Sequence, residues 1–402
     1  MLLYTCLLWL MTSGLWTIRA QDTNENVSVK GAYRKLATNN IGFAFSLFQH
    51  LQSLAPDENI IFSPISISMA LSMMVLGAGN QTGTQILQGS GFNHSPIPKA
   101  DILQSFQQLY QLLRQLDDSL GMSMGNTLFF QQSLKLMDLS SDDLKRYYGL
   151  ENVAIDFKNW DRGSSQINEY IKEKTRGKIS DLLSKLKDPT PLTLLNYIYS
   201  TGLWTKPFDP DNTKEENFFV DDKTIVKVPM MTQTSVFNFL YDPILDCTAL
   251  QLDNVGNRTT LFVLQHGDNK DRLIHELTQD TLIRWSQSIV TSLVEVNVPR
   301  LSLSGTYDLG DIMKSMDIID LKKEQTDLTG ITGNAKRKLS KVLHAAQLEI
   351  MEQGLKPEVP TNDSMYRNRR PAIIRFDRPF LVMVFDKVSW SILFLGKVIN
   401  PV

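Results

Sequence analysis

Residue types that support catalysis are present in the sequence, but they form no known catalytic, metal or phosphate motif. His275 and Glu276 begin the H-E-x-x-H pattern of zinc proteases, yet Gln279 stands where the second histidine is required. A glycine-rich run at 77–83 misses the dinucleotide-binding spacing by one residue and follows a helical rather than a strand-like stretch. The sequence also lacks a phosphate-binding P-loop and a G-x-S-x-G nucleophile turn. We therefore predict a protein that is not an enzyme and that uses no metal and no cofactor.

Cysteine chemistry rests on one residue of the mature chain. Cys6 lies in the apolar N-terminal segment, so Cys247 remains alone after processing, and one thiol forms no internal disulfide. Cys247 stands in a strand-like stretch, which favours a small buried apolar side chain over a nucleophile. The stability of the fold must then come from its core.

A long irregular stretch at 352–370 is rich in polar residues, proline and arginine. It has no apolar period of 2 or 3.6 residues, so we expect an exposed loop, and loops of this length are often functional. Pro371 obstructs cleavage after Arg370, because proline lacks the backbone N–H and fixes φ. Cleavage by a trypsin-like protease after Arg367 or Arg369 is expected on such a loop.

The first twenty residues predict a secretory signal. They are apolar, nearly uncharged and end in the small Ala20, and residues 12–14 interrupt the apolar run before it reaches the length of a membrane span. Cleavage after Ala20 would release residues 21–402 as an extracellular chain. Five N-x-S/T sequons are then candidate glycosylation sites: Asn26, Asn80, Asn93, Asn257 and Asn362.

Charge and periodicity are those of a globular chain. Lys and Arg (41) nearly balance Asp and Glu (43), so neither nucleic acid nor a membrane surface is an expected partner. Helical periods alternate irregularly with strand-like runs, and a Gly256-Asn257 turn predicts a hairpin. The absence of a regular βαβ pattern favours one α+β domain over residues 21–402. The strand-like runs lie at 59–62, 123–130, 192–199, 218–228, 236–264 and 292–303.

Several longer motifs, in this order, resemble the serpins of clade A over nearly the whole mature chain. They are NIIFSPISISMALSMMVLGA at 59–78, QINEYIKEKTRGKI at 166–179, NYIYSTGLW at 196–204, VPMM at 228–231, SKVLHAA at 340–346 and IRFDRPFLVMV at 374–384. The resemblance implies an α+β fold with three β-sheets, eight to nine helices and an exposed reactive centre loop at about 352–370. It also implies a scissile bond between Asn368 and Arg369. The hinge of that loop would consist of Glu352, Gly354, Leu355 and Pro357.

The hinge sequence bears on whether this chain traps proteases. Inhibitory serpins insert the cleaved hinge into their main sheet, which needs paired N–H groups and small side chains. Pro357 and Pro360 remove two donors, each unmet buried group costs about 1–3 kcal/mol, and Leu355 is large for the slot. We therefore expect a non-inhibitory serpin that proteases cleave as a substrate. The alternative is an inhibitor directed at trypsin-like enzymes by Arg367 or Arg369.

Further stretches resemble the non-inhibitory serpins that carry steroid hormones in plasma. They include DFKNWDRGSSQIN, KEENFFVDD, VGNRTT, TYDLGDI and FDKVSWSILFLGKVINPV. The resemblance implies a pocket between two helices and the adjacent sheet, where Trp390 stacks on the steroid, Gln251 hydrogen-bonds a steroid oxygen and Arg34 makes a further contact. A flat apolar ligand needs such an aromatic face and a few placed polar groups. The expected ligand is cortisol, corticosterone or progesterone, and the expected state is a monomer.

Three positions of the implied steroid site depart from the family pattern. Gln279 stands where arginine is frequent, Ile283 where a polar residue is frequent, and Lys387 where some members have histidine. Fewer polar anchors would weaken steroid binding or change the preferred steroid. Two alternatives stay open: Trp390 and Gln251 could serve the core alone, and the chain could be a serpin with another ligand or none.

Overall fold

The computed structural model describes residues 25–92, 98–115, 121–133, 138–180, 182, 192–267, 270–333, 338–339, 341–354 and 370–402. Some predicted positions fall outside these residues: the signal segment 1–20, Asn93, Leu355, Pro357, Asn362, Asn368 and Arg369. The backbone alone is described at Asn26 and Arg34. Among the described residues, no helix is both long enough and apolar enough to cross a membrane.

Ten α-helices lie in the described part of the chain, one more than the largest number expected. The difference is small, because α11 is a single four-residue turn. Their bounds are α2 (Glu25–Leu54), α3 (Pro64–Leu76), α4 (Asn80–Gly89), α5 (Lys99–Gln115), α6 (Asp138–Tyr148), α7 (Trp160–Lys174), α8 (Lys270–Glu276), α9 (Gln279–Ser288), α10 (Leu309–Ser315) and α11 (Thr329–Thr332).

The described strands form two sheets. The five-stranded sheet has the order β10 (Leu301–Asp308), β11 (Lys341–Ile350), β4 (Leu192–Thr201), β2 (Met122–Gln131) and β3 (Leu150–Ile155). The nine-stranded sheet has the order β1 (Ile60–Phe62), β14 (Ile392–Val398), β13 (Phe380–Asp386), β8 (Arg258–Gln265), β7 (Cys247–Asn254), β6 (Ile225–Asp242), β9 (Val290–Pro299) and β12 (Ala372–Arg375), with β5 (Lys214–Phe219) paired to β6.

The predicted α+β class is confirmed, but two sheets are found among the described residues where three were expected. The reason is the length of β6, which runs for 18 residues. Its first part pairs with β5, its middle with β9 and its last part with β7. These pairings join β5, β7 and β9 into one sheet with β6.

Two predicted strands are each divided in the structure. The run 218–228 contains a turn, because the Asp221 carboxylate accepts hydrogen bonds from the backbone N–H groups of Lys223 (2.7 Å) and Thr224 (2.8 Å). The run 292–303 changes sheet at Arg300, whose N–H donates to the Pro229 carbonyl at 2.8 Å. The hairpin of β7 and β8 around the Gly256-Asn257 turn is confirmed.

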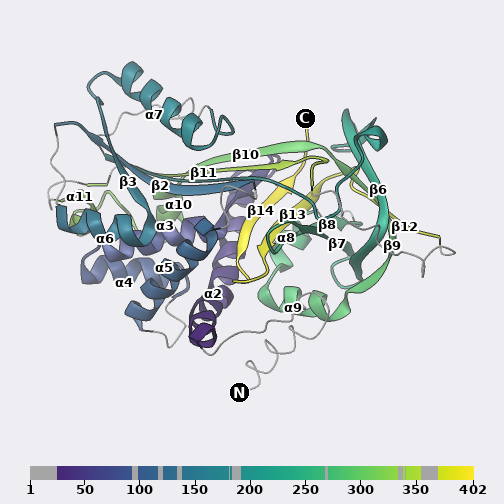
Figure 1. The fold of residues 1–402 in the computed structure, drawn as a ribbon, viewed down its shortest axis with the longest axis horizontal. Helices are drawn as coiled ribbons and strands as arrows, with labels where there is room; N and C mark the ends of the chain where they lie inside the picture. Colours follow the sequence, from purple (N-terminus) through teal and green to yellow (C-terminus); the bar gives the residue numbers. More distant parts are fainter. Residues whose placement is uncertain are drawn as a thin grey trace.

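Helices cover both faces of the five-stranded sheet (Figure 1). On one face lies α7, which packs Ile167 and Ile171 into a small separate core with Ala345 of β11. On the other lies α3, which is strongly apolar and is buried from Pro64 to Val75. Ser63 caps α3 by accepting a hydrogen bond from the Ser66 N–H at 3.2 Å.

A buried polar network joins α3 to the centre of the five-stranded sheet. His344 of β11 is fully buried, and its Nε2 accepts a hydrogen bond from the Ser63 N–H at 3.0 Å. Its Nδ1 must then carry the proton, which it donates to Asn196 Oδ1 at 2.6 Å. The other end of the Asn196 amide donates to Asn126 at 2.9 Å, which agrees with this orientation. Burial lowers the pKa of His344 to about 3, so the imidazole is neutral.

Candidate functional site

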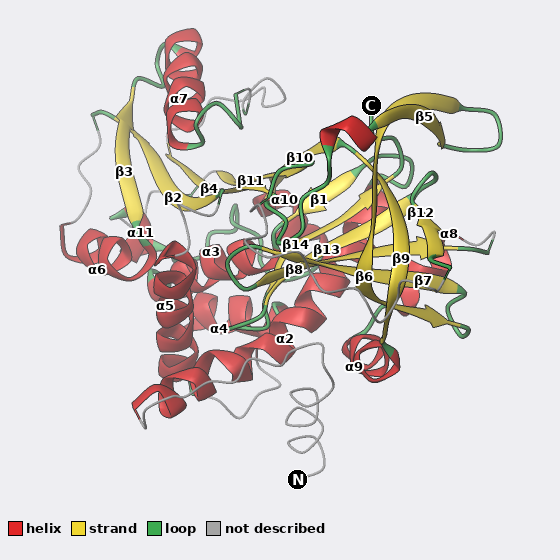
Figure 2. Cartoon of the chain, turned by 45° about the vertical axis from the view of Figure 1, so that its right-hand side comes forward, coloured by secondary structure: helices red, strands yellow, loops and turns green. Residues whose placement is uncertain are grey.

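The candidate ligand site lies on one face of the nine-stranded sheet. Antiparallel pairing places Asn238, Gln251, Leu261 and Met383 in one row across β6, β7, β8 and β13. Directly paired residues share a face of the sheet, so this row mixes polar groups at one end with apolar groups at the other. Helices α2 and α9 pack near this region, and Figure 2 shows α9 beside the end of β6 and β7.

Gln251 is the buried polar group of this row. Its side chain is 4% exposed, and its Nε2 donates to Asp253 Oδ1 at 3.2 Å. Its Oε1 has no hydrogen-bond partner among the described residues. An unpaired buried carbonyl costs about 1–3 kcal/mol, so this oxygen is a natural acceptor for a ligand donor.

Asp253 connects Gln251 to Lys387. Both strand residues lie on one face of β7, because they are two positions apart. The Lys387 ammonium donates to Asp253 Oδ1 at 2.6 Å, and its backbone N–H donates to the carbonyl of Asn257 at 2.8 Å. Lys387 is therefore held between the Asp253 side chain on β7 and the turn that joins β7 to β8.

Trp390 lies in the turn that joins β13 to β14, three residues after Lys387. Its φ is 65°, a left-handed backbone conformation that is rare for a bulky residue and costs about 1–2 kcal/mol. Asp386 holds this turn: its carboxylate accepts from the Ser389 N–H at 2.6 Å, and its carbonyl accepts from the Trp390 N–H at 2.8 Å. Burial raises the pKa of Asp386. Trp390 itself is half-buried.

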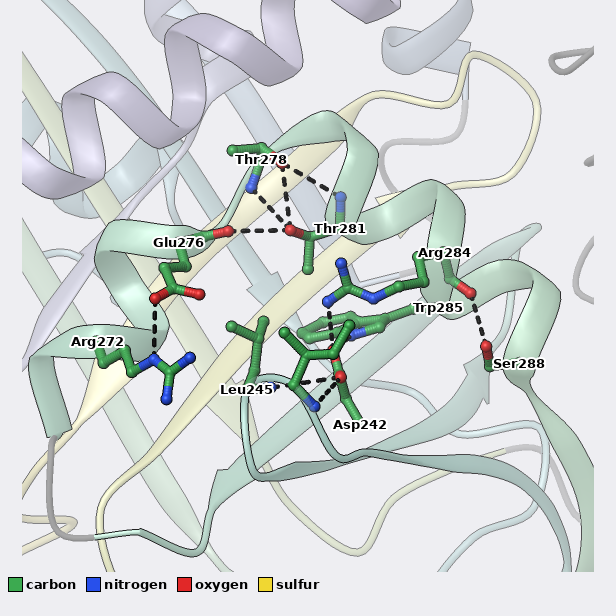
Figure 3. A network of polar contacts seen from close by, with 10 residues as sticks. Asp242, Leu245, Arg272, Glu276, Thr278, Thr281, Arg284, Trp285 and Ser288 are labelled. Atoms are coloured by element: carbon green, nitrogen blue, oxygen red, sulfur yellow. Dashed lines mark hydrogen bonds and ion pairs between the residues drawn. The ribbon is translucent and has the colours of Figure 1, made fainter.

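A second buried network fixes α9 to the sheet (Figure 3). The Asp242 carboxylate accepts from the Arg284 guanidinium at 2.5 Å, the Trp285 indole N–H at 2.7 Å and the Ile244 N–H at 2.9 Å. Burial acts to raise the pKa of Asp242, but the hydrogen bonds from Arg284 and Trp285 hold it below its usual value. Thr278 begins α9 with a capping box.

The predicted site residues divide into two groups. Gln251 and Lys387 are brought together through Asp253, and Trp390 shares the turn of Lys387. Gln279 and Ile283 are half-buried and lie one turn apart on α9, which is attached to β6 through Asp242. Arg34 lies on α2, where the backbone alone is described.

Sequence reasoning missed Asp253. Its signal was available, because an acidic residue two positions after Gln251 in a strand must share its face. The partner of Asp253 could not be found in the same way, since Lys387 is 134 residues away in the sequence.

The hinge of the predicted reactive loop begins just after the end of β11 and is held by contacts of Glu352, Gln353 and Gly354. The Glu352 carboxylate accepts from the Thr213 hydroxyl at 2.8 Å and pairs with Arg300 at 2.9 Å. The Trp204 N–H donates to the Gln353 carbonyl at 3.0 Å, and Trp204 forms a parallel bridge with Gly354. A Cβ at Gly354 would lie 2.2 Å from the Trp204 carbonyl oxygen, so only glycine fits this contact.

Three further kinds of residue were singled out in the sequence: Cys247, His275 and the asparagines of the sequons. Cys247 is fully buried, as predicted, and burial raises the pKa of its thiol to about 12. His275 is exposed on α8, and no cluster of metal-binding side chains occurs among the described residues. Of the sequon asparagines, Asn80 and Asn257 are exposed.

Comparison with known proteins identifies the family. The family model described as Serpin (serine protease inhibitor) matches residues 38–401. The chain belongs to the serpin family. It is 48% identical over 399 residues to the corticosteroid-binding globulin of Ovis aries, covering 99% of this chain and 93% of that protein. It is 47% identical over 403 residues to the corticosteroid-binding globulin of Homo sapiens, covering 100% of both.

Solved structures agree with the family. Human thyroxine-binding globulin, solved in complex with its hormone, superposes with a TM-score of 0.84 at 35% sequence identity, covering 92% of this chain and 99% of that one. Mouse protein-Z dependent protease inhibitor superposes with a TM-score of 0.82 at 29% identity, covering 94% and 100%. The same backbone arrangement therefore occurs in a hormone-binding globulin and in a protease inhibitor.

Proposed function

We propose that this chain is a non-inhibitory serpin that binds and transports a steroid hormone in the extracellular fluid. The observation that carries the proposal is that the half-buried, left-handed Trp390 lies in the same turn as Lys387, whose ammonium contacts Asp253 beside the buried Gln251. The indole would supply an aromatic face, and Gln251 Oε1 a hydrogen-bond acceptor. The corticosteroid-binding globulins that match the chain over nearly its whole length support the same class of ligand.

The proposal includes the state of the circulating protein. Removal of the N-terminal signal would release a monomer into the plasma, with glycans on exposed sequons such as Asn80 and Asn257. Arg34, Gln279, Ile283 and Lys387 would complete the steroid site from α2, α9 and the β13–β14 turn. Proteases would act on the reactive loop as on a substrate.

Trp390 gives the direct test of steroid binding. Cortisol is expected to quench the tryptophan fluorescence of the purified protein, and Trp390→Ala to lose this quenching and at least tenfold in affinity, because the stacking face is removed. Trp390→Gly should bind cortisol equally poorly. Its free energy of unfolding should be about 1 kcal/mol higher than that of the alanine variant, since glycine adopts a φ of 65° without strain.

Trp160 provides the matched control. It lies on α7 and stacks on Phe157 at a centroid separation of 6.4 Å, away from the nine-stranded sheet. Trp160→Phe should leave the quenching and the retention of radiolabelled cortisol unchanged. Unaltered cortisol retention by Trp390→Ala would contradict the proposed site, and no retention by the natural protein would contradict the proposed function.

Cleavage of the reactive loop tests the non-inhibitory part of the proposal. After nicking by trypsin at Arg367 or Arg369, the melting temperature is expected to change by less than about 5 °C, because Pro357 and Pro360 oppose insertion of the hinge as a new strand. Circular dichroism melts of the intact and nicked protein measure this. A large rise in melting temperature, or a complex with trypsin that survives SDS, would favour an inhibitory serpin instead.

A further inference from the structure

We propose that Asp253 is a positioning residue that fixes the orientation of the Gln251 amide and so makes the site select a steroid hydroxyl over a ketone. The inference rests on the proposed function and names the ligand group that this site recognises. It concerns a residue for which the sequence motifs gave no role. The group that the site recognises depends on which end of the Gln251 amide faces Asp253.

A carboxamide offers two donors at its nitrogen and an acceptor at its oxygen, so its orientation decides what it recognises. An ionised carboxylate accepts hydrogen bonds only. Because Asp253 Oδ1 lies 3.2 Å from the Gln251 amide, the nitrogen must face it, and the opposite orientation would place two acceptors in contact. Gln251 Oε1 is thereby directed away from Asp253 and remains without a protein donor in the described part of the chain.

Lys387 holds Asp253 in this position. Its ammonium lies 2.6 Å from Asp253 Oδ1, and 16% of its side chain is exposed. Its own place is fixed by the backbone hydrogen bond to the Asn257 carbonyl at 2.8 Å. Lys387 and Gln251 therefore both donate to the Asp253 carboxylate. Gln251 Oε1 is left as an acceptor without a protein donor among the described residues.

An open acceptor discriminates between oxygen functions. A steroid hydroxyl can donate to Gln251 Oε1, whereas a ketone at the same position would present a second acceptor and leave both oxygens unpaired in a site where Gln251 is 4% exposed. Sites built to hydrogen-bond a hydroxyl reject analogues that lack it strongly. We expect a preference of 10- to 100-fold for the hydroxyl member of a matched pair at the contacted carbon.

The test uses the mature full-length protein and matched steroid pairs. Cortisol and cortisone differ by a hydroxyl and a ketone at one ring carbon, and 20α-dihydroprogesterone and progesterone differ in the same way on the side chain. Equilibrium dialysis with each steroid gives the affinity ratio for each pair. The natural protein should prefer the hydroxyl in at least one pair, and Asp253→Asn should reduce that preference at least tenfold, because an asparagine can donate and so allows Gln251 to turn.

Two further variants separate orientation from general loss of structure. Gln251→Met removes the acceptor and should abolish the preference. Lys387→Met removes the group that holds Asp253 and should reduce the preference, but by less than Asp253→Asn, because the Asp253 carboxylate can still face the Gln251 nitrogen. An unchanged ratio in Asp253→Asn, or no preference by the natural protein in either pair, overturns this inference while leaving steroid binding intact. If the natural protein binds none of the four steroids, the proposed function and this inference fall together.

Discussion

Between pH 7 and pH 5, the free energy of unfolding is expected to fall by about 2 kcal/mol through His344 alone. Burial lowers the pKa of His344 to about 3 in the folded protein, whereas an unfolded histidine titrates near 6.5. Below pH 6.5 the unfolded chain therefore binds a proton at His344, whereas the folded chain does not bind it until the pH approaches 3. The stabilising contribution is complete above pH 6.5 and is lost progressively as the pH falls from 6.5 towards 3.

Urea unfolding followed by circular dichroism at pH 7, 6 and 5 measures this loss. The control is His344→Gln, which is destabilised at every pH because it disturbs the contacts with Ser63 and Asn196, but which carries no titrating group. Its free energy of unfolding should change by less than about 1 kcal/mol over the same range. Equal pH dependence in the natural protein and in the variant would show that His344 is not the responsible group.

Replacement of Asp242 by alanine is expected to lower the free energy of unfolding by about 3 kcal/mol. Asp242 is 4% exposed, and its removal leaves the indole N–H of Trp285 and the N–H of Ile244 without their acceptor. It also releases Arg284, so α9 loses its polar attachment to β6. Steroid affinity should fall as well, because Gln279 and Ile283 are carried by α9.

Asp242→Asn is the conservative comparison, because its amide oxygen can still accept from Trp285. It should lose about half as much stability as the alanine variant. Arg272→Ala removes the exposed i,i+4 ion pair with Glu276 in the same region (Figure 3) and should leave unfolding unchanged within error. Thermal and urea unfolding of the three variants measure these differences. An alanine variant at position 242 as stable as the natural protein would show that the network does not hold α9.

Local patterns predicted the elements that are defined within one stretch of chain. The Gly256-Asn257 turn predicted a hairpin, and the hairpin is present. The arrangement of strands in the sheets was harder to predict from the sequence, because β6 pairs with β5, β9 and β7 through residues that no single local pattern links. The Asp221 turn was missed because alternating apolar residues concealed it.

The sequence named residues for the candidate site but carried no information on their geometry. Resemblance to related sequences pointed to Gln251, Lys387 and Trp390 without saying how they are held. The contact of Lys387 with Asp253 joins segments 134 residues apart, and the left-handed backbone at Trp390 carries no local signal, since that conformation is typical of glycine. Both features follow from tertiary packing around Asp386 and the β7–β8 turn.

Cys247 is the one cysteine among the described residues, and its thiol has a practical consequence for studying motion in this molecule. It lies on β7 opposite Asp242, fully buried and with its pKa raised to about 12, so alkylating reagents should meet almost no thiolate while the sheet and α9 remain closed. The rate at which Cys247 is alkylated therefore measures how often the region around α9 opens transiently. A protein with several exposed cysteines would need mutagenesis before it could report one such event.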